Sequence, residues 1–155
     1  MRRRLSEPRR VVEEEEIAPE QIWSVSASSD YAWPAAWIAS PSSVLDPDES
    51  TMWNARSFAP AWIRFDLGHA ALPIERLELL PSMEPKVGTV EHRIRMGQNA
   101  SSMDTVAIVG GPCRDREWIH CRFPQPRRAR FVEILTTKSP SWVAWIRVRL
   151  WTERR

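Results

Sequence analysis

Apolar and polar residues alternate along most of this chain, and the alternation predicts β-strands. Every second residue of the segment 61–67 is apolar, while Arg64 and Asp66 lie between them and Gly68 follows. Successive side chains of a strand point to opposite faces, so this segment is expected to be a strand with one buried face. Similar patterns predict further strands at residues 22–27, 74–80, 90–96, 105–109, 118–123, 130–136 and 143–151.

The segments between these strands indicate how the strands connect. Pro and Ser are frequent there, and the chain contains 13 Pro against 5 Gly. Proline suits turns and strand ends but not helix interiors, and no segment has a convincing amphipathic helical pattern. The sequence therefore predicts an all-β fold, an antiparallel β-sandwich.

An acidic, turn-rich segment precedes the strand at 61–67. Residues 46–53 read Asp-Pro-Asp-Glu-Ser-Thr-Met-Trp. Asp, Pro and Ser favour compact turns. We expect a tight loop that ends on Trp53, whose large side chain can plug the core.

The N-terminal segment differs from the rest of the chain. Residues 1–20 contain a basic block followed by the acidic block 13–16, and little that is apolar. Such a composition favours a flexible charged arm, or an arm that becomes ordered against a partner subunit. We expect two parts, the arm at 1–20 and the sandwich at 21–155.

Four segments, in this order, resemble the discoidin domain, also called the coagulation-factor type C domain. They are Val-Ser-Ala-Ser-Ser at 25–29, the loop 44–53, Trp-Ile-Arg-Phe-Asp-Leu-Gly at 62–68, and Ala-Arg-Phe-Val-Glu-Ile at 129–134. The resemblance covers about residues 22–151. It implies a galactose-binding-like jelly roll, in a family that includes many bacterial carbohydrate-binding modules.

The resemblance also implies a structural calcium ion in the acidic loop. Asp46, Asp48 and Thr51 match the ligand positions of the family, and calcium prefers oxygen ligands. A glutamate that the family places on the final strand is missing, because this chain reads Trp-Ile-Arg at 145–147. The alternative is a turn in which the two aspartates accept main-chain N–H bonds.

Ligands of the family bind where loops gather at one end of the sandwich. An aromatic ring that packs on a pyranose, flanked by side chains that bond its hydroxyls, makes a sugar site. On this chain the loops that correspond offer the candidate ligand-binding residues Tyr31, Trp33, Trp37, Glu84, Lys86, Ser139 and Trp142. His92 lies on the predicted inward face of its strand and is expected to belong to the core.

The sequence contains no recognisable catalytic motif. A nucleophile elbow, a phosphate-binding glycine loop and a zinc-protease helix are all missing. His120 and Cys121 are adjacent on a predicted strand and would point to opposite faces, which argues against a shared metal. We expect a protein that is not an enzyme. Cys113 and Cys121 are expected to be reduced thiols, and the alternative is a disulfide that closes the short loop between them.

Charge and apolar content exclude other functions. The formal net charge is only +2, and the arginines alternate with apolar residues along strands, so nucleic-acid binding is not expected. No apolar run follows Met1, which predicts neither a signal peptide nor a membrane span. The expected location is the cytoplasm, or export as part of a larger particle.

Two functions remain open. The first is a non-catalytic carbohydrate-binding module that uses the Trp- and Tyr-bearing loops. The alternative is a protein-interaction or assembly subunit of a phage-tail, secretion or injection apparatus. The charged arm and the excess of tryptophan, 9 residues, favour the alternative, because tryptophan is frequent at interface hot spots.

Overall fold

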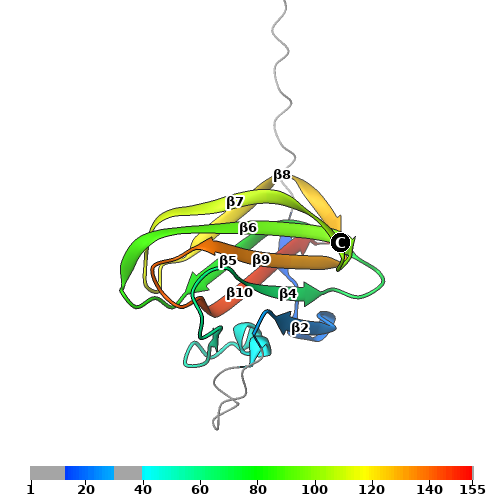
Figure 1. Ribbon diagram of the computed structural model, residues 1–155. Coiled ribbons are helices and arrows are strands. Elements are labelled where there is room, and N and C mark those ends of the chain that lie inside the picture. The colour runs from blue at the N-terminus through cyan, green and yellow to red at the C-terminus, as the bar shows by residue number, and fades with distance from the viewer. Residues whose placement is uncertain (1–12, 30–39, 155) are drawn as a thin grey trace, which may run out of the picture.

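The computed structural model describes residues 13–29 and 40–154, and these form two stacked antiparallel sheets (Figure 1). The first sheet contains, in order of pairing, β1 (Glu14–Glu16), β10 (Ala144–Glu153), β5 (Leu72–Pro81) and β8 (Ile119–Ala129), and β3 (Trp53–Asn54) also pairs with β10. The second contains β2 (Ser24–Ala27), β4 (Ala61–Asp66), β9 (Phe131–Lys138), β6 (Val87–Asn99) and β7 (Ser102–Arg114). The predicted all-β sandwich is confirmed.

Short helical turns are the other regular elements of the described chain. They are the 3-10 turns η1 (Pro19–Gln21) and η2 (Pro41–Leu45). None of the described residues forms a helix long and apolar enough to cross a membrane.

The core lies between the sheets and follows the predicted alternation. On β4, Ile63 and Phe65 are fully buried, and on β6 the inward residue Ile94 is fully buried as well. Trp53 is buried as expected for a core plug, and it pairs in register with the buried Trp145 of β10. Side chains from both sheets therefore meet in one continuous core.

Trp23, which directly precedes β2, lies outside the core. It is 59% exposed, whereas the preceding residue Ile22 is buried. The ring packs edge-on against His69, with centroids 4.7 Å apart. It also covers Gly68, where an added Cβ would lie 2.4 Å from the indole nitrogen and where φ is +82°. Only glycine suits this end of β4.

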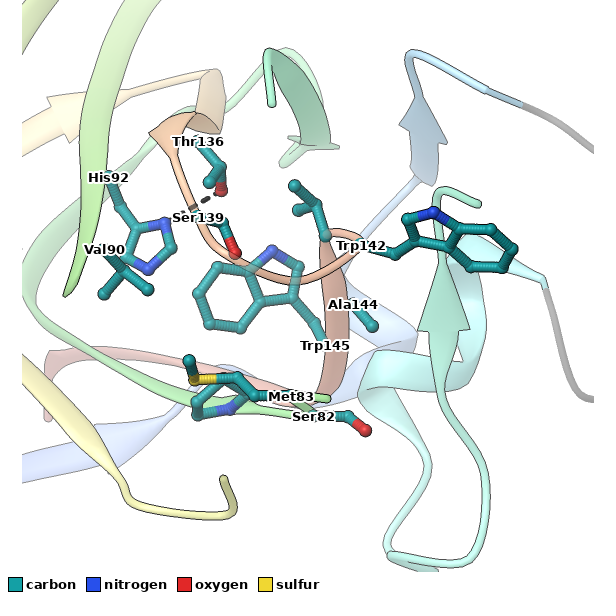
Figure 2. A pocket seen from close by; sticks show the side chains of 11 residues that line it. Ser82, Met83, Val90, His92, Thr136, Ser139, Trp142, Ala144 and Trp145 are labelled. Carbon is teal, nitrogen blue, oxygen red and sulfur yellow. Dashed lines mark hydrogen bonds between the residues drawn. The ribbon is translucent and has the colours of Figure 1, made fainter. Parts of the chain in front are cut away.

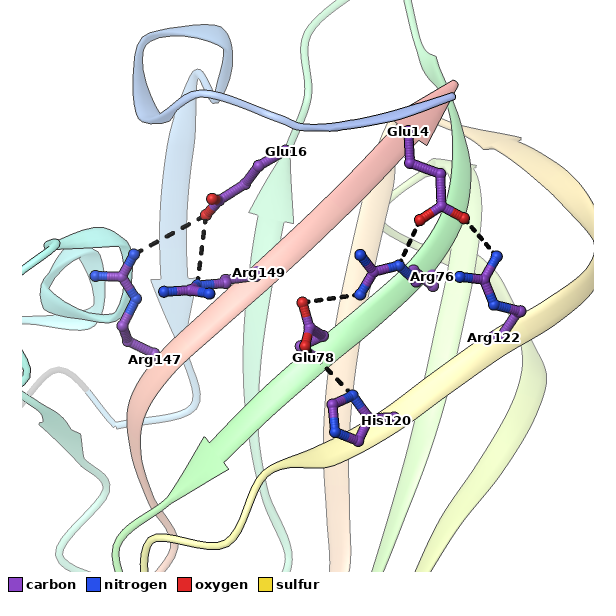
Figure 3. Close-up of polar contacts among 8 residues, drawn as sticks. All are labelled: Glu14, Glu16, Arg76, Glu78, His120, Arg122, Arg147 and Arg149. Atoms are coloured by element: carbon purple, nitrogen blue, oxygen red, sulfur yellow. Dashed lines mark hydrogen bonds and ion pairs between the residues drawn. The ribbon is translucent and has the colours of Figure 1, made fainter. Parts of the chain in front are cut away.

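The first sheet begins inside the segment 1–20 that was expected to be a flexible arm. β1 pairs with β10, and Ile17 is 3% exposed in the core. Glu14 bonds the guanidinium of Arg76 at 2.6 Å and also pairs with Arg122 (Figure 3). The acidic block is thus ordered because it meets arginines on the sheet, and residues 1–12 lie outside the described chain.

The outer face of the second sheet carries a buried carboxylate between two arginines. Glu133 of β9 is 1% exposed and lies opposite Arg64 of β4 and Arg95 of β6. Arg64 donates to it at 2.7 Å and Arg95 at 2.9 Å. This triad joins the three central strands on their outer face.

We predict that Glu133→Gln lowers the free energy of unfolding by about 1–2 kcal/mol, since charged hydrogen bonds to both arginines weaken. The arginine side chains are 23% and 32% exposed, so water compensates part of the loss. Urea denaturation measures the effect. Glu153→Gln, at the exposed end of β10, is the control and should cost less than about 0.5 kcal/mol. Equal stability of Glu133→Gln and wild type would contradict a stabilising triad.

Candidate functional site

Three loops meet at one end of the sandwich, and main-chain hydrogen bonds hold them together. They are residues 55–60 before β4, 82–86 before β6 and 139–143 before β10, and the last two lie at the left-hand end in Figure 1. Ala55 N–H donates to the carbonyl of Val143 at 2.8 Å, and Val143 N–H donates to that of Ser57 at 3.0 Å. Glu84 N–H donates to Ser141 Oγ at 3.0 Å. The loops are therefore fixed relative to one another.

The loop 82–86 is also anchored by a residue that follows β7. Met83 is 5% exposed, and its N–H donates to Asp115 Oδ1 at 2.7 Å. Behind the loop, Gly88 lies against Pro140, so that an added Cβ would be 2.4 Å from the proline ring. This close approach brings the start of β6 and the loop 139–143 into direct contact.

An open groove of about 450 Å³ lies among these loops, within the size range of small-molecule sites. Its lining residues are Asn54, Phe58, Ser82, Glu84, Pro85, Pro140, Ser141, Trp142 and Ala144. Phe58 is 60% exposed and Trp142 is 44% exposed. Exposed rings beside a concave surface provide flat apolar platforms for a ligand.

Polar groups lie beside these rings. Asn54 Oδ1 accepts the N–H of Arg56 at 2.8 Å, which fixes the orientation of the Asn54 amide. The Arg56 guanidinium carbon lies 5.9 Å from the centre of the Trp142 ring. Ser141 is 4% exposed, and its hydroxyl donates to the carbonyl of Trp142, so it supports the loop. Asn54 and Glu84 therefore offer polar groups in the groove to the hydroxyl groups of a ligand, and Arg56 lies beside the Trp142 ring.

A second, much smaller cavity of about 10 Å³ lies beside the groove and shares Trp142 with it (Figure 2). His92 is 3% exposed there, as its predicted inward orientation requires. Its Nδ1 is 2.8 Å from Thr136 Oγ1, and its ring lies 4.7 Å from that of Trp145. Burial disfavours the charged imidazolium and lowers the pKa of His92 to about 4. His92 thus lines the small cavity as a neutral side chain.

We predict that His92 makes the fold sensitive to acid. Its pKa is about 4 in the folded state, against an ordinary value of 6.5 in the unfolded chain. Between these values only the unfolded state binds the proton. Stability that is present above about pH 6.5 is therefore lost as the pH falls to about 4, by about 3 kcal/mol.

Urea denaturation at pH 7 and pH 4 measures this effect. His92→Gln should lose about 3 kcal/mol less than wild type over this range. His120→Gln should behave as wild type, because the His120 side chain is 65% exposed. An unchanged pH dependence in His92→Gln would show that other groups are responsible.

The residues predicted to bind ligand are only partly brought together. Glu84 and Trp142 line the groove, and Ser139 lines the small cavity behind it. Lys86 is exposed and lines neither. The other three, Tyr31, Trp33 and Trp37, lie outside the described residues and stay a prediction.

Sequence reasoning missed Asn54, Arg56 and Phe58. A signal was present, because these residues directly follow the predicted core plug Trp53 and precede the strand at 61–67. Phe58 lies in a short loop near Pro60, and an aromatic residue in such a loop is a candidate for exposure. The sequence does not reveal that this loop forms main-chain hydrogen bonds with Val143, the residue after Trp142.

The acidic loop does not fit a calcium ion. Asp46 Oδ1 accepts the N–H of Asp48 at 2.9 Å, and Asp48 Oδ1 accepts that of Ser50 at 2.9 Å. The Ser50 N–H bond holds the pKa of Asp48 below its ordinary value. Thr51 Oγ1 donates to the Asp48 carbonyl at 3.1 Å, and Arg147 donates to the carbonyl of Asp46. The alternative of a turn closed by main-chain N–H bonds describes this arrangement.

Other titratable groups do not assemble into a metal centre either. Within 13–29 and 40–154, no three His, Cys, Asp or Glu side chains are arranged to hold a metal. Cys113 and Cys121 are both buried and unpaired, and burial raises the pKa of each thiol. His120 faces outward and lies 3.3 Å from Glu78, while Cys121 faces the core, as their adjacency predicted.

Much of the tryptophan excess is accounted for within the chain. On the outer faces, the Arg64 guanidinium lies 4.2 Å from the centre of the Trp62 ring. Arg76 lies 4.1 Å from that of Trp151. Arginine over an indole face is a favourable cation–π contact. These tryptophans have partners on their own sheet, so their number alone does not require a protein partner.

A rigid β-sandwich with an aromatic-lined groove on its loops defines a class of ligand-binding domains. The family model described as "F5/8 type C domain" matches residues 24–152. The chain belongs to the F5/8 type C family, which is the discoidin family that its sequence resembles.

Solved structures share the fold. The family 32 carbohydrate-binding module of NanJ from C. perfringens, in complex with galactose, has a TM-score of 0.73 at 17% identity, over 89% of this chain and 98% of that one. The corresponding module of AlyQ, in complex with 4,5-unsaturated mannuronic acid, has a TM-score of 0.64 at 22% identity, over 83% and 94%. A pectin-binding module has a TM-score of 0.63 at 20% identity, over 84% and 90%. Among curated proteins, none matches this chain significantly in sequence.

Proposed function

We propose that this protein is a non-catalytic carbohydrate-binding module and that the groove among its loops is the sugar site. The observation that carries the proposal is the pair of exposed rings, Phe58 and Trp142, beside a concave surface that main-chain hydrogen bonds hold in place. A pyranose presents an apolar face of C–H groups, which packs well on an aromatic ring.

The polar groups of the groove suit hydroxyl recognition. Asn54 offers an amide and Glu84 a carboxylate that accepts hydrogen bonds, and the Arg56 guanidinium lies beside the Trp142 ring. Since the three loops are already bonded to one another, little ordering is needed on binding. A preformed site of this kind reduces the entropic cost of holding a small ligand.

The structural relatives support the class of ligand. Modules that share this fold are described in complex with galactose, in complex with 4,5-unsaturated mannuronic acid, or as pectin-binding. Neutral and acidic sugars are both represented among them. Glu84 lines the groove of this chain and Arg56 lies beside its Trp142 ring, so a panel of both kinds is the appropriate probe.

We predict that the protein binds at least one member of a panel of galactose, N-acetylgalactosaminyl-β-1,3-galactose, mannuronate oligosaccharides and pectin fragments. Trp142→Ala should weaken that binding by about tenfold or more, because the stacking platform is lost. Isothermal titration calorimetry measures the affinity without depending on tryptophan emission.

Trp23→Ala is the matched control. Trp23 is also exposed, but its N–H donates to the carbonyl of Asp66 at the end of β4. The loop 55–60 precedes Ala61, at the opposite end of this strand. Its replacement should leave the affinity unchanged. If folded wild type gives no heat with any probe at millimolar concentration, or if Trp142→Ala binds as wild type does, the groove is not a sugar site.

The assembly role stays a prediction. It depended on the charged segment 1–20 and on the tryptophan excess. The described part of that segment packs on its own sheet, and several tryptophans stack on arginines of this chain. These contacts favour the sugar-binding proposal over the alternative.

A further inference from the structure

Arg147 occupies the position on the final strand where the family resemblance implies a carboxylate. A register shift between Trp145 and Arg147 on β10 precedes it, and shifts of this kind redirect the side chains that follow. The side chain is 6% exposed, although arginine is rarely buried without partners. Its location therefore requires a partner within the fold.

That partner is the acidic loop. Arg147 Nη1 donates to the main-chain carbonyl of Asp46, which begins the loop 46–51. The family resemblance implies that main-chain carbonyls of this loop are among the calcium ligands. Here the Arg147 guanidinium donates to the Asp46 carbonyl instead. Arg147 is positively charged at a position where the family resemblance implies a negatively charged ligand.

The side-chain oxygens of the loop are also engaged within the loop. Asp46 and Asp48 each accept a main-chain N–H two residues ahead, both at 2.9 Å. Thr51 Oγ1 donates to the carbonyls of Asp48 and Ser43, at 3.1 Å and 3.4 Å. The loop is closed without an ion. What it still requires is a link to the last strand, and Arg147 provides one.

The charge of Arg147 is balanced by β1. Glu16 Oε1 lies 3.9 Å from Arg147 Nη2 and 3.8 Å from Arg149 Nε (Figure 3). β1 precedes the part of the chain that the family model matches, which begins at residue 24. The negative charge on this face of the sheet is therefore that of Glu16, from a strand outside the matched region, and the positive charge is that of Arg147 on β10.

We propose that the Arg147 guanidinium replaces the calcium ion that the family resemblance implies. It joins the loop 46–51 to the final strand, and Glu16 of β1 supplies the balancing carboxylate. Replacing a carboxylate by a guanidinium changes the local charge by two units, which repels a divalent cation at this distance. The fold of this domain is therefore independent of calcium, whether or not it binds sugar.

The wild-type protein provides the first test. Its melting temperature should be the same in EDTA and in millimolar calcium, and terbium, a luminescent probe for calcium sites, should give no tryptophan-sensitised emission. A lower melting temperature in EDTA, or saturable terbium emission, would overturn the proposal. This measurement does not involve sugar, so its outcome is separate from that of the sugar-binding test.

Substitutions at the link provide the second test. Arg147→Met keeps the length of the side chain but removes its donors, and it should lower the melting temperature by roughly 4–8 °C. Hydrogen exchange should accelerate in residues 46–51. Arg149→Met is the matched control, because Arg149 also lies near Glu16 but stacks on Trp118. It should leave exchange in the loop unchanged, and equal effects of the two variants would contradict a specific link.

Arg147→Glu restores the carboxylate that the family resemblance implies. If the guanidinium replaces the ion, calcium should raise the melting temperature of this variant but not that of wild type. A variant that folds and does not respond to calcium would show that the loop lacks the ligands whatever residue stands at 147. The proposed replacement would then be wrong.

Discussion

The pairing of β3 with β10 at the buried residues Trp53 and Trp145 is the constraint on which the rest of this structure depends. The two residues are register partners on β3 and β10, and both are almost completely buried. Trp53 ends the acidic loop, and Asn54, the next residue, lines the groove. Trp145 packs against His92 beside the groove, and the register shift that follows it precedes Arg147. The core, the groove and the link to the acidic loop therefore all meet at this one strand pairing.

The strands could be predicted from the sequence because their signal is local. Alternation with a period of two identifies Ile63, Phe65 and Ile94 as inward residues without any knowledge of their partners. The order of the acidic block could not be predicted, because β1 depends on pairing with β10, far along the chain. The acidic residues of β1 have few apolar side chains beside them, and their charges are balanced by arginines of the sheet such as Arg76 and Arg122.

The groove was harder to predict than the sheets. Glu84 and Trp142 could be selected by residue type, but Phe58 and Asn54 join them only through bonds between loops that are distant in sequence. The absence of the final-strand glutamate is visible in the sequence. The reach of Arg147 to the carbonyl of Asp46 is not, because it depends on the bulge in β10 and on the counter-charge from Glu16. Arginine thus takes three roles in this fold, stacking on indoles, neutralising Glu133 and closing the acidic loop.

The most direct test of the central claim is to map where sugar binds. A series of ¹⁵N-resolved NMR spectra, recorded on the intact protein during titration with galactose and with pectin fragments, follows every assigned main-chain amide. The sugar-site proposal predicts that the shifts change in residues 54–58, 82–86 and 139–143, and stay unchanged at β1 and at the Asp66 end of β4. Changes confined to other surfaces, or no change with either sugar while the spectrum remains that of a folded protein, would contradict it.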